Sequence, residues 1–166
     1  MKIFLSYAGE DREQAASLNQ MLEAEGYEVF FDRTDLRPGE KYNQKIHDEA
    51  ASSDLMIFLI SPDSVAEGSY TLTELKWAKE KWPDPEGHIL PVMIRRTEYK
   101  NIPAFIKSVL TVLEPEGNLE AELLHEVNII AKRRFTDNTR MSWTRGFRKG
   151  RAFGEKLTAR FFDWLK

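Results

Sequence analysis

Short apolar runs alternate with amphipathic stretches along the first 135 residues of the chain. Runs of this length, bounded by turn residues, predict strands, and several are apolar on both faces, as a sheet covered by helices on both sides requires. Five runs fit this description: Ile3–Tyr7, Tyr27–Phe31, Asp54–Ile60, Ile89–Ile94 and Val109–Leu113.

Apolar residues at helical spacing fall between these runs. They form three stripes: Ala15, Leu18 and Leu22; Tyr42, Ile46 and Ala50; and Leu119, Leu123, Val127 and Ile130. A shorter crossover falls near Pro103–Lys107. Alternating strands and helices predict an α/β fold with a parallel, doubly wound sheet and right-handed crossovers. The flavodoxin-like strand order 2-1-3-4-5 is the natural candidate.

Length and composition indicate one soluble domain with a small appendage. The chain has 166 residues, and domains most often hold roughly 100–150. It has no cysteine, which excludes disulfides and a cysteine nucleophile and fits a cytoplasmic protein. No run is long enough for a signal-peptide core or a membrane span, so we expect neither a targeting nor a transmembrane segment.

Charge separates a body, residues 1–135, from a basic tail, residues 136–166. Positions 137–166 hold eight Lys or Arg against three Asp or Glu, whereas the preceding residues carry a net charge of −8. The acidic body argues against binding to nucleic acid. In the tail an aromatic and aliphatic stripe recurs every four residues and predicts an amphipathic helix that packs on protein, in preference to an anionic membrane: Phe153, Leu157, Phe161 and Leu165.

Any ligand site should lie at one edge of the predicted sheet. In open parallel sheets ligands bind at the carboxyl ends of the strands, where the strand order reverses. The loops that follow Tyr7, Phe31 and Ile60 all open onto that edge. Candidate site residues are therefore sought in these loops.

Several chemistries lack the residues they need. A phosphoacceptor receiver requires an Asp after the third strand and a Lys after the fifth, but these runs end at Ile60-Ser61-Pro62 and Leu113-Glu114. Glycine-rich phosphate loops are absent. The three histidines are scattered, with no metal-ligand pair and no serine-hydrolase elbow, so we expect no metal site.

Glu74 is the remaining candidate for catalysis. Cleavage of an N-glycosidic bond passes through an oxocarbenium-like transition state, which a fixed carboxylate stabilises. Helical spacing turns Leu72 and Leu75 toward the core. It places Glu74 between Tyr70 and Trp77 on another face, a surface suited to a ribose and a base.

The same glutamate has a structural alternative. Thr71-Leu-Thr-Glu74 matches a capping box, in which the glutamate only reaches back to an N-terminal amide of its own helix. Local sequence alone favours this structural role.

Three spaced motifs resemble the Toll/interleukin-1 receptor (TIR) domain family, of the prokaryotic NAD-cleaving type. The resemblance covers about residues 1–134. Its motifs are Phe4-Leu-Ser6-Tyr7-Ala-Gly9-Glu10-Asp11, then Asp32-Arg-Thr-Asp35-Leu36-Arg37-Pro38-Gly39-Glu40, and finally Ser61-Pro-Asp-Ser64 leading to Tyr70-Thr-Leu-Thr-Glu74-Leu75. One departure is visible, because Tyr70-Thr71 stands where the family often has Trp-Cys.

The resemblance implies a role for each motif. Glu74 would be the catalytic residue, at the family's usual distance beyond a Ser-x-x-Ser element. The implied substrate-binding residues are Ser6, Tyr7, Asp32, Arg33, Ser61, Ser64 and Tyr70, and helical spacing adds Trp77. The implied BB loop, which closes over the ligand and joins subunits, consists of Asp35, Leu36, Arg37, Pro38 and Gly39.

The resemblance also implies an activity: an NAD+ glycohydrolase, activated by self-assembly and serving as an immune or anti-phage effector. NAD+ would be the substrate, no cofactor would be needed, and an upstream sensor protein is a further expected partner. Two alternatives stay open. One is a non-enzymatic TIR adaptor that acts by TIR–TIR assembly, and the other is an enzyme like the nucleoside deoxyribosyltransferases.

Overall fold

A computed structural model describes residues 1–31, 42–109 and 117–136 of the chain. In order along the chain, the elements are β1 Lys2–Ser6, η1 Gly9–Asp11, α1 Arg12–Ala24, β2 Glu28–Phe30, α2 Tyr42–Ser52, β3 Leu55–Ile60, α3 Tyr70–Lys81, β4 Ile89–Met93, η2 Tyr99–Asn101 and α4 Ala104–Lys107. A further helix occupies residues 119–136. Met1–His125 is one compact unit, and Glu126 begins a second, of which the helical residues up to 136 are described.

The described strands form one parallel sheet in the order β2-β1-β3-β4. Ile3 of β1 pairs with Val29 of β2 and with Leu55 of β3, while Ile57 of β3 pairs with Leu90 of β4. The predicted α/β class and the order of the first four strands are confirmed. The fifth predicted strand, Val109–Leu113, lies beyond the described residues except for Val109, which is in a bend.

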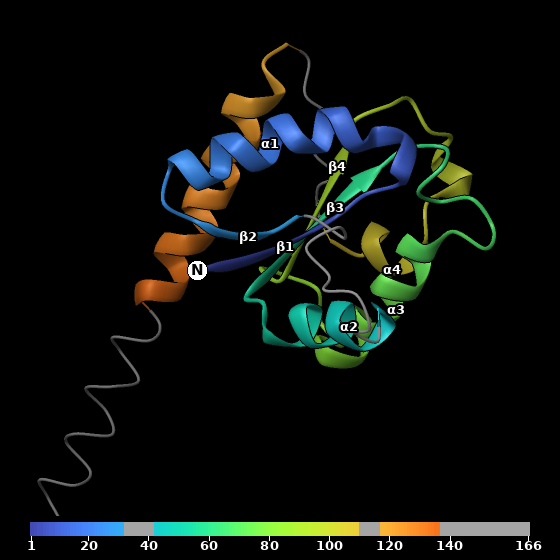
Figure 1. The fold of residues 1–166 in the computed structure, drawn as a ribbon, viewed down its shortest axis with the longest axis horizontal. Helices are drawn as coiled ribbons and strands as arrows, with labels where there is room; N and C mark the ends of the chain where they lie inside the picture. Colours follow the sequence, from blue (N-terminus) through green and yellow to red (C-terminus); the bar gives the residue numbers. More distant parts are fainter. Residues whose placement is uncertain (32–41, 110–116, 137–166) are drawn as a thin grey trace, which may run out of the picture. The chain divides into compact units, whose positions relative to one another are not determined.

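Helices cover both faces of the sheet, with α1 on one side and α2 and α3 on the other (Figure 1). Successive strand side chains point to opposite faces. The even-numbered side chains of β3 pack on the α2 and α3 side, in a core cluster that includes Phe4, Phe58, Ile46 and Leu75. All six residues of β3 are buried, which explains why its sequence is apolar throughout.

The predicted helical stripes are largely confirmed by burial. Ala15, Leu18 and Leu22 are buried on α1. Helix α1 ends in a Schellman motif, because Gly26 has a φ of +83° and the amide of Tyr27 donates to the carbonyl of Leu22. The predicted short crossover corresponds to α4, which has four residues.

The division of the chain at 135/136 stays a prediction. The described helix continues to residue 136, and the rest of the predicted tail, 137–166, lies outside the described residues. Within the part of the chain that is described, no helix is both long and apolar enough to cross a membrane.

Candidate functional site

Glu74 and Ser6 form a buried polar pair at the carboxyl edge of the sheet. Ser6 ends β1, and strand alternation turns it to the same face as Phe4, toward α2 and α3. Its Oγ donates a hydrogen bond of 2.5 Å to Oε2 of Glu74 on α3. Ser6 is fully buried and Glu74 is only 1% exposed. A carboxylate is thus held in place by a residue 68 positions away in the sequence.

The capping box that local sequence favours does not form as predicted. Helix α3 begins at Tyr70 with Ser69 as its N-cap, so Thr71 lies inside the first turn instead of capping the helix. The hydroxyl of Thr71 donates to the carbonyl of Ser64 and contacts the hydroxyl of Ser69. The side chain of Glu74 reaches across to β1.

The position of Glu74 on α3 also differs from the prediction. Its side chain is buried together with Thr71, Leu75 and Ala78, at the border between this buried face and the aromatic face. Leu72, predicted to face the core, is only partly buried. Helical spacing had assigned the acid to the face of Tyr70 and Trp77, because residues three and four positions apart lie side by side on a helix.

The Ser-x-x-Ser element forms a tight turn just after β3. The amide of Ser61 donates to Oγ of Ser64 at 2.9 Å, and the amide of Ser64 donates to Oγ of Ser61 at 3.1 Å. Both serines are fully buried. Through its carbonyl, Ser64 accepts the hydroxyl of Thr71, so the turn is tied to the first turn of α3.

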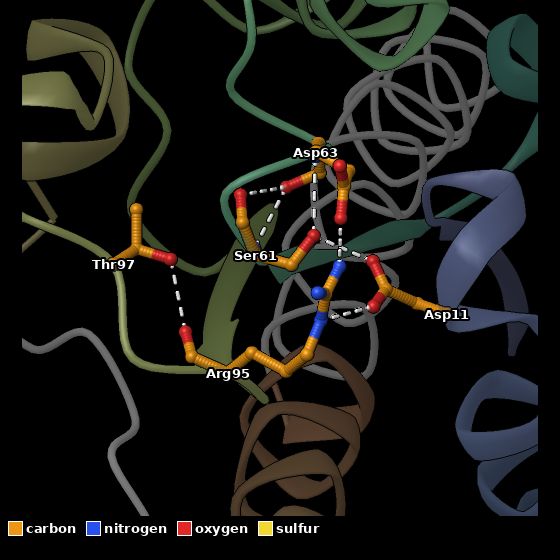
Figure 2. Close-up of polar contacts among 6 residues, drawn as sticks. Asp11, Ser61, Asp63, Arg95 and Thr97 are labelled. Carbon is orange, nitrogen blue, oxygen red and sulfur yellow. Dashed lines mark hydrogen bonds and ion pairs between the residues drawn. The ribbon is translucent and has the colours of Figure 1, made fainter.

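Asp11 connects this turn to two other strand ends (Figure 2). Ser61 Oγ donates to Asp11 Oδ2 at 2.5 Å, and Arg95 Nε donates to Asp11 Oδ1 at 2.7 Å. Asp11 is the N-cap of α1, yet its side chain makes no capping hydrogen bond. Its carboxylate, 3% exposed, instead binds groups that follow β3 and β4.

Arg95 lies between two carboxylates. Besides Asp11 it contacts the half-exposed Asp63, which belongs to the turn after β3. The hydrogen bond to Asp63 and then the one to Asp11 raise the pKa of the Arg95 guanidinium above its ordinary value. The side chain of Thr97 donates to the carbonyl of Arg95 at 2.9 Å. Arg95 therefore stays charged while it joins the strand ends.

The predicted aromatic residues fall into two groups. Tyr7 is buried and stacks on Phe31, with ring centroids 5.2 Å apart. Tyr70 and Trp77 on α3 are partly buried and meet edge to face at 6.0 Å. Trp77 also meets His47 of α2 edge to face, which places this pair over the contact between the two helices.

The structure therefore brings together Ser6 with Glu74, and Ser61 with Ser64. Asp32, Arg33 and the predicted BB loop residues Asp35, Leu36, Arg37, Pro38 and Gly39 lie outside the described residues. In the described ranges, no three His, Cys, Asp or Glu side chains gather as a metal ion would need.

Sequence reasoning did not single out Asp11 and Arg95, which the structure joins to the Ser-x-x-Ser turn. Asp11 was named only as the last residue of the first motif, and Arg95 was not considered. They are 84 positions apart, and only the sheet order brings them together. The rule that residues after parallel strands converge at one edge of the sheet could have identified both residues from the sequence.

The chain belongs to the TIR domain family. The family model described as TIR domain matches residues 3–124. The order of motifs and the parallel sheet agree with this membership. No curated protein matches the chain.

Solved structures with a similar fold include two receptor proteins. The TIR domain of the Toll-related receptor TRR-2 from Hydra magnipapillata has a TM-score of 0.60 and 24% identity, over 80% of this chain and 97% of that one. A metazoan TIR-STING receptor from C. gigas, solved in complex with 2′,3′-cGAMP, has a TM-score of 0.55 and 21% identity, over 64% of this chain. This chain spans 33% of the length of that receptor.

A more distant fold similarity extends to an enzyme. The 2-deoxyribosyltransferase from Bacillus psychrosaccharolyticus has a TM-score of 0.50 at 12% identity, over 72% of this chain and 90% of that one. At such identities these three similarities describe the fold and carry no activity with them.

Proposed function

We propose that the protein is an NAD+ glycohydrolase that cleaves the bond between nicotinamide and ribose, with Glu74 as the catalytic residue. The observation that carries the proposal is the buried Ser6–Glu74 pair at the carboxyl edge of a TIR sheet, where parallel sheets bind ligands. A buried carboxylate is costly to the fold, and such residues gather at functional sites.

The chemistry asks little of the protein beyond placing a negative charge. As the bond between ribose C1′ and the pyridinium nitrogen breaks, its electron pair leaves with neutral nicotinamide and the ribose becomes an oxocarbenium ion. The Glu74 carboxylate stabilises this cation, because a fixed charge in a dry site acts more strongly than in water. Water then adds at C1′ and releases a proton, giving ADP-ribose, or a nucleophile within the same molecule adds and gives a cyclic product. NAD+ is the substrate in this reaction, and no cofactor takes part.

The burial of Glu74 supports the idea that activity requires assembly. At 1% exposure, the carboxylate meets a substrate only after neighbouring groups move. We propose that self-association through TIR–TIR contacts, promoted by an upstream sensor, produces the open site. The protein would then act as an immune effector that depletes NAD+, for example against phage.

A second candidate is a scaffold that acts only by TIR–TIR assembly. The same burial favours it, because Glu74 hydrogen-bonded to Ser6 satisfies both groups without any substrate. In that case Glu74 would be a structural residue of the TIR fold.

A nicotinamide-release assay separates the two candidates. Wild type, Glu74→Gln and Glu80→Gln are incubated with NAD+ under conditions in which each is shown to oligomerise. Glu80 lies exposed on the same helix and provides the matched control for the lost charge. The enzyme proposal predicts release by wild type and Glu80→Gln and none by Glu74→Gln. Assembled wild type that releases no nicotinamide identifies a scaffold.

The deoxyribosyltransferase-like alternative needs one more arm in this assay. Purine and pyrimidine deoxynucleosides replace NAD+, and release of the free base is measured. The NAD+ proposal predicts turnover of NAD+ alone. Base release from nucleosides, with NAD+ left intact, would assign the site to the other substrate class.

A further inference from the structure

We infer that Asp11 and Arg95 are positioning residues for Glu74, an inference that rests on the proposed function of that glutamate. Neither residue belongs to the Ser6–Glu74 pair. They act through a continuous series of hydrogen bonds that runs from the start of α1, across the ends of β3 and β4, to the first turn of α3.

The series begins at the buried carboxylate of Asp11. One oxygen accepts from Ser61 at 2.5 Å and the other from Arg95 at 2.7 Å, so both oxygens of the carboxylate are used. An aspartate at an N-cap ordinarily accepts from an amide of its own helix. Here α1 forms without that bond, which indicates that the carboxylate serves another purpose.

The next link is the reciprocal pair of serines. Ser61 is held by Asp11 and in turn fixes Ser64 through two amide–hydroxyl bonds. The hydroxyl of Ser64 donates in addition to the carbonyl of Ser61 at 3.1 Å. With these bonds and full burial, the turn has little freedom to shift unless Asp11 releases it.

The last link reaches the catalytic helix. The carbonyl of Ser64 accepts the hydroxyl of Thr71, which lies one turn before Glu74 on the same buried face of α3. Ser6 fixes the far end of the glutamate side chain. Glu74 is therefore located from two sides, by β1 through Ser6 and by Asp11 through the serine turn.

Arg95 sets the position of Asp11 itself. Its side chain is 41% exposed and contacts the carboxylates of Asp11 and Asp63. The arginine balances the charge that Asp11 carries into a nearly dry site. A displacement of about 1 Å at a catalytic group can lower the rate by about 100-fold, so loss of either residue should reduce turnover without removing a substrate contact.

The test compares Asp11→Asn, Arg95→Gln and the double variant with Glu49→Gln. Glu49 forms a 2.7 Å ion pair with Lys2 near the amino ends of the strands, so its variant removes one charge and one ion pair away from the series. We expect kcat for NAD+ to fall roughly 10- to 100-fold in Asp11→Asn, with KM changed less than about twofold. The double variant should be no slower than Asp11→Asn, because Arg95 acts through Asp11. Glu49→Gln should keep the wild-type kcat.

Amide hydrogen exchange supplies a readout that does not depend on NAD+ cleavage. Asp11→Asn should speed exchange in the first turn of α3, residues 71–74, by about tenfold or more relative to Glu49→Gln. If wild type releases no nicotinamide, the proposed function fails, and faster exchange still supports the structural series. Unchanged exchange together with unchanged kcat, or a rise in KM alone, overturns the inference. Should Asp11→Asn not fold, the half-exposed Arg95→Gln carries both measurements under the same criteria.

Discussion

The two edges of the sheet handle their polar residues differently. At the amino edge, Lys2 pairs with Glu49 at 2.7 Å and its amide donates to Asp54 at 2.7 Å, and the side chains of this ion pair keep about a quarter of their surface in water. At the carboxyl edge, Ser6, Ser61 and Glu74 are almost completely buried; Ser6 donates a hydrogen bond to Glu74, and Ser61 donates one to Asp11. Both edges belong to the same parallel strands.

The amino edge holds polar groups that water can still reach, whereas the carboxyl edge holds polar groups that need hydrogen-bond partners within the protein. An ion pair that keeps part of its surface in water contributes little, since water replaces the lost partner. Buried polar groups are costly unless every one is hydrogen-bonded, so removing one leaves another unsatisfied. Buried polar groups at the carboxyl edge, where parallel sheets bind ligands, are compatible with the proposed chemical role of Glu74 as well as with a structural one, and the variants below separate the two.

Ser6→Ala tests the carboxyl edge with the largest expected effect. The variant removes the 2.5 Å hydrogen bond to the buried Glu74. We expect the free energy of unfolding to fall by about 1–3 kcal/mol, because a buried acceptor loses a donor. Turnover of NAD+ should fall by roughly 100-fold, as when one fixed polar group of a catalytic site is removed. Denaturant unfolding and nicotinamide release measure the two effects, and a variant as active as wild type contradicts the assigned pairing.

Thr71→Val tests the link between the serine turn and α3. Valine keeps the shape of threonine but cannot donate to the buried carbonyl of Ser64. We expect a loss of about 1 kcal/mol in the free energy of unfolding, measured by urea denaturation. Thr73→Val, at an exposed position of the same helix, is the control and should change stability much less. Equal losses in both variants would mean that the link contributes nothing.

Glu49→Gln probes the amino edge. Since both partners of this ion pair reach water, we expect a loss below about 1 kcal/mol that shrinks further in high salt. Urea denaturation at low and high salt measures it. A loss as large as that of Ser6→Ala would remove the contrast between the two edges.

The pH dependence of the amino edge gives the smallest effect. The hydrogen bond to Glu49 raises the pKa of Lys2 above its ordinary value of 10.5, against a partial loss from burial. A raised lysine pKa means that the stabilisation is fully present below pH 10.5 and is lost as the pH rises through the folded-state value. Burial also raises the pKa of Tyr27, which titrates in the same direction, so the contribution of Lys2 is the difference between wild type and Glu49→Gln. That difference should shrink above pH 10.5, and one that grows contradicts the assignment.

Local patterns were sufficient to predict the frame of the molecule. Short apolar runs predicted the four described strands, because burial on both faces of a parallel sheet leaves a strong signal in the sequence. Their order followed from the alternation of strands and helices, which is typical of a flavodoxin-like sheet. The stripe of Ala15, Leu18 and Leu22 predicted the buried face of α1, because apolar residues at helical spacing lie on one side of a helix.

The site was less accessible to such reasoning. The capping-box pattern at Thr71 depended on where α3 begins, and the N-cap proved to be Ser69. Burial of Glu74 depends on Ser6, and the role of Asp11 depends on Arg95. These contacts join residues from different strands, so periodicity within one segment carries no information about them.

The most direct test measures nicotinamide release and thermal unfolding on the same samples of assembled wild type and Glu74→Gln. Glutamine keeps an oxygen that can accept from Ser6 but loses the negative charge. A catalytic Glu74 predicts release by wild type, none by the variant, and an unfolding midpoint that stays close to that of wild type. Wild type that leaves NAD+ intact, beside a variant whose midpoint drops, would contradict the account and make Glu74 a structural residue.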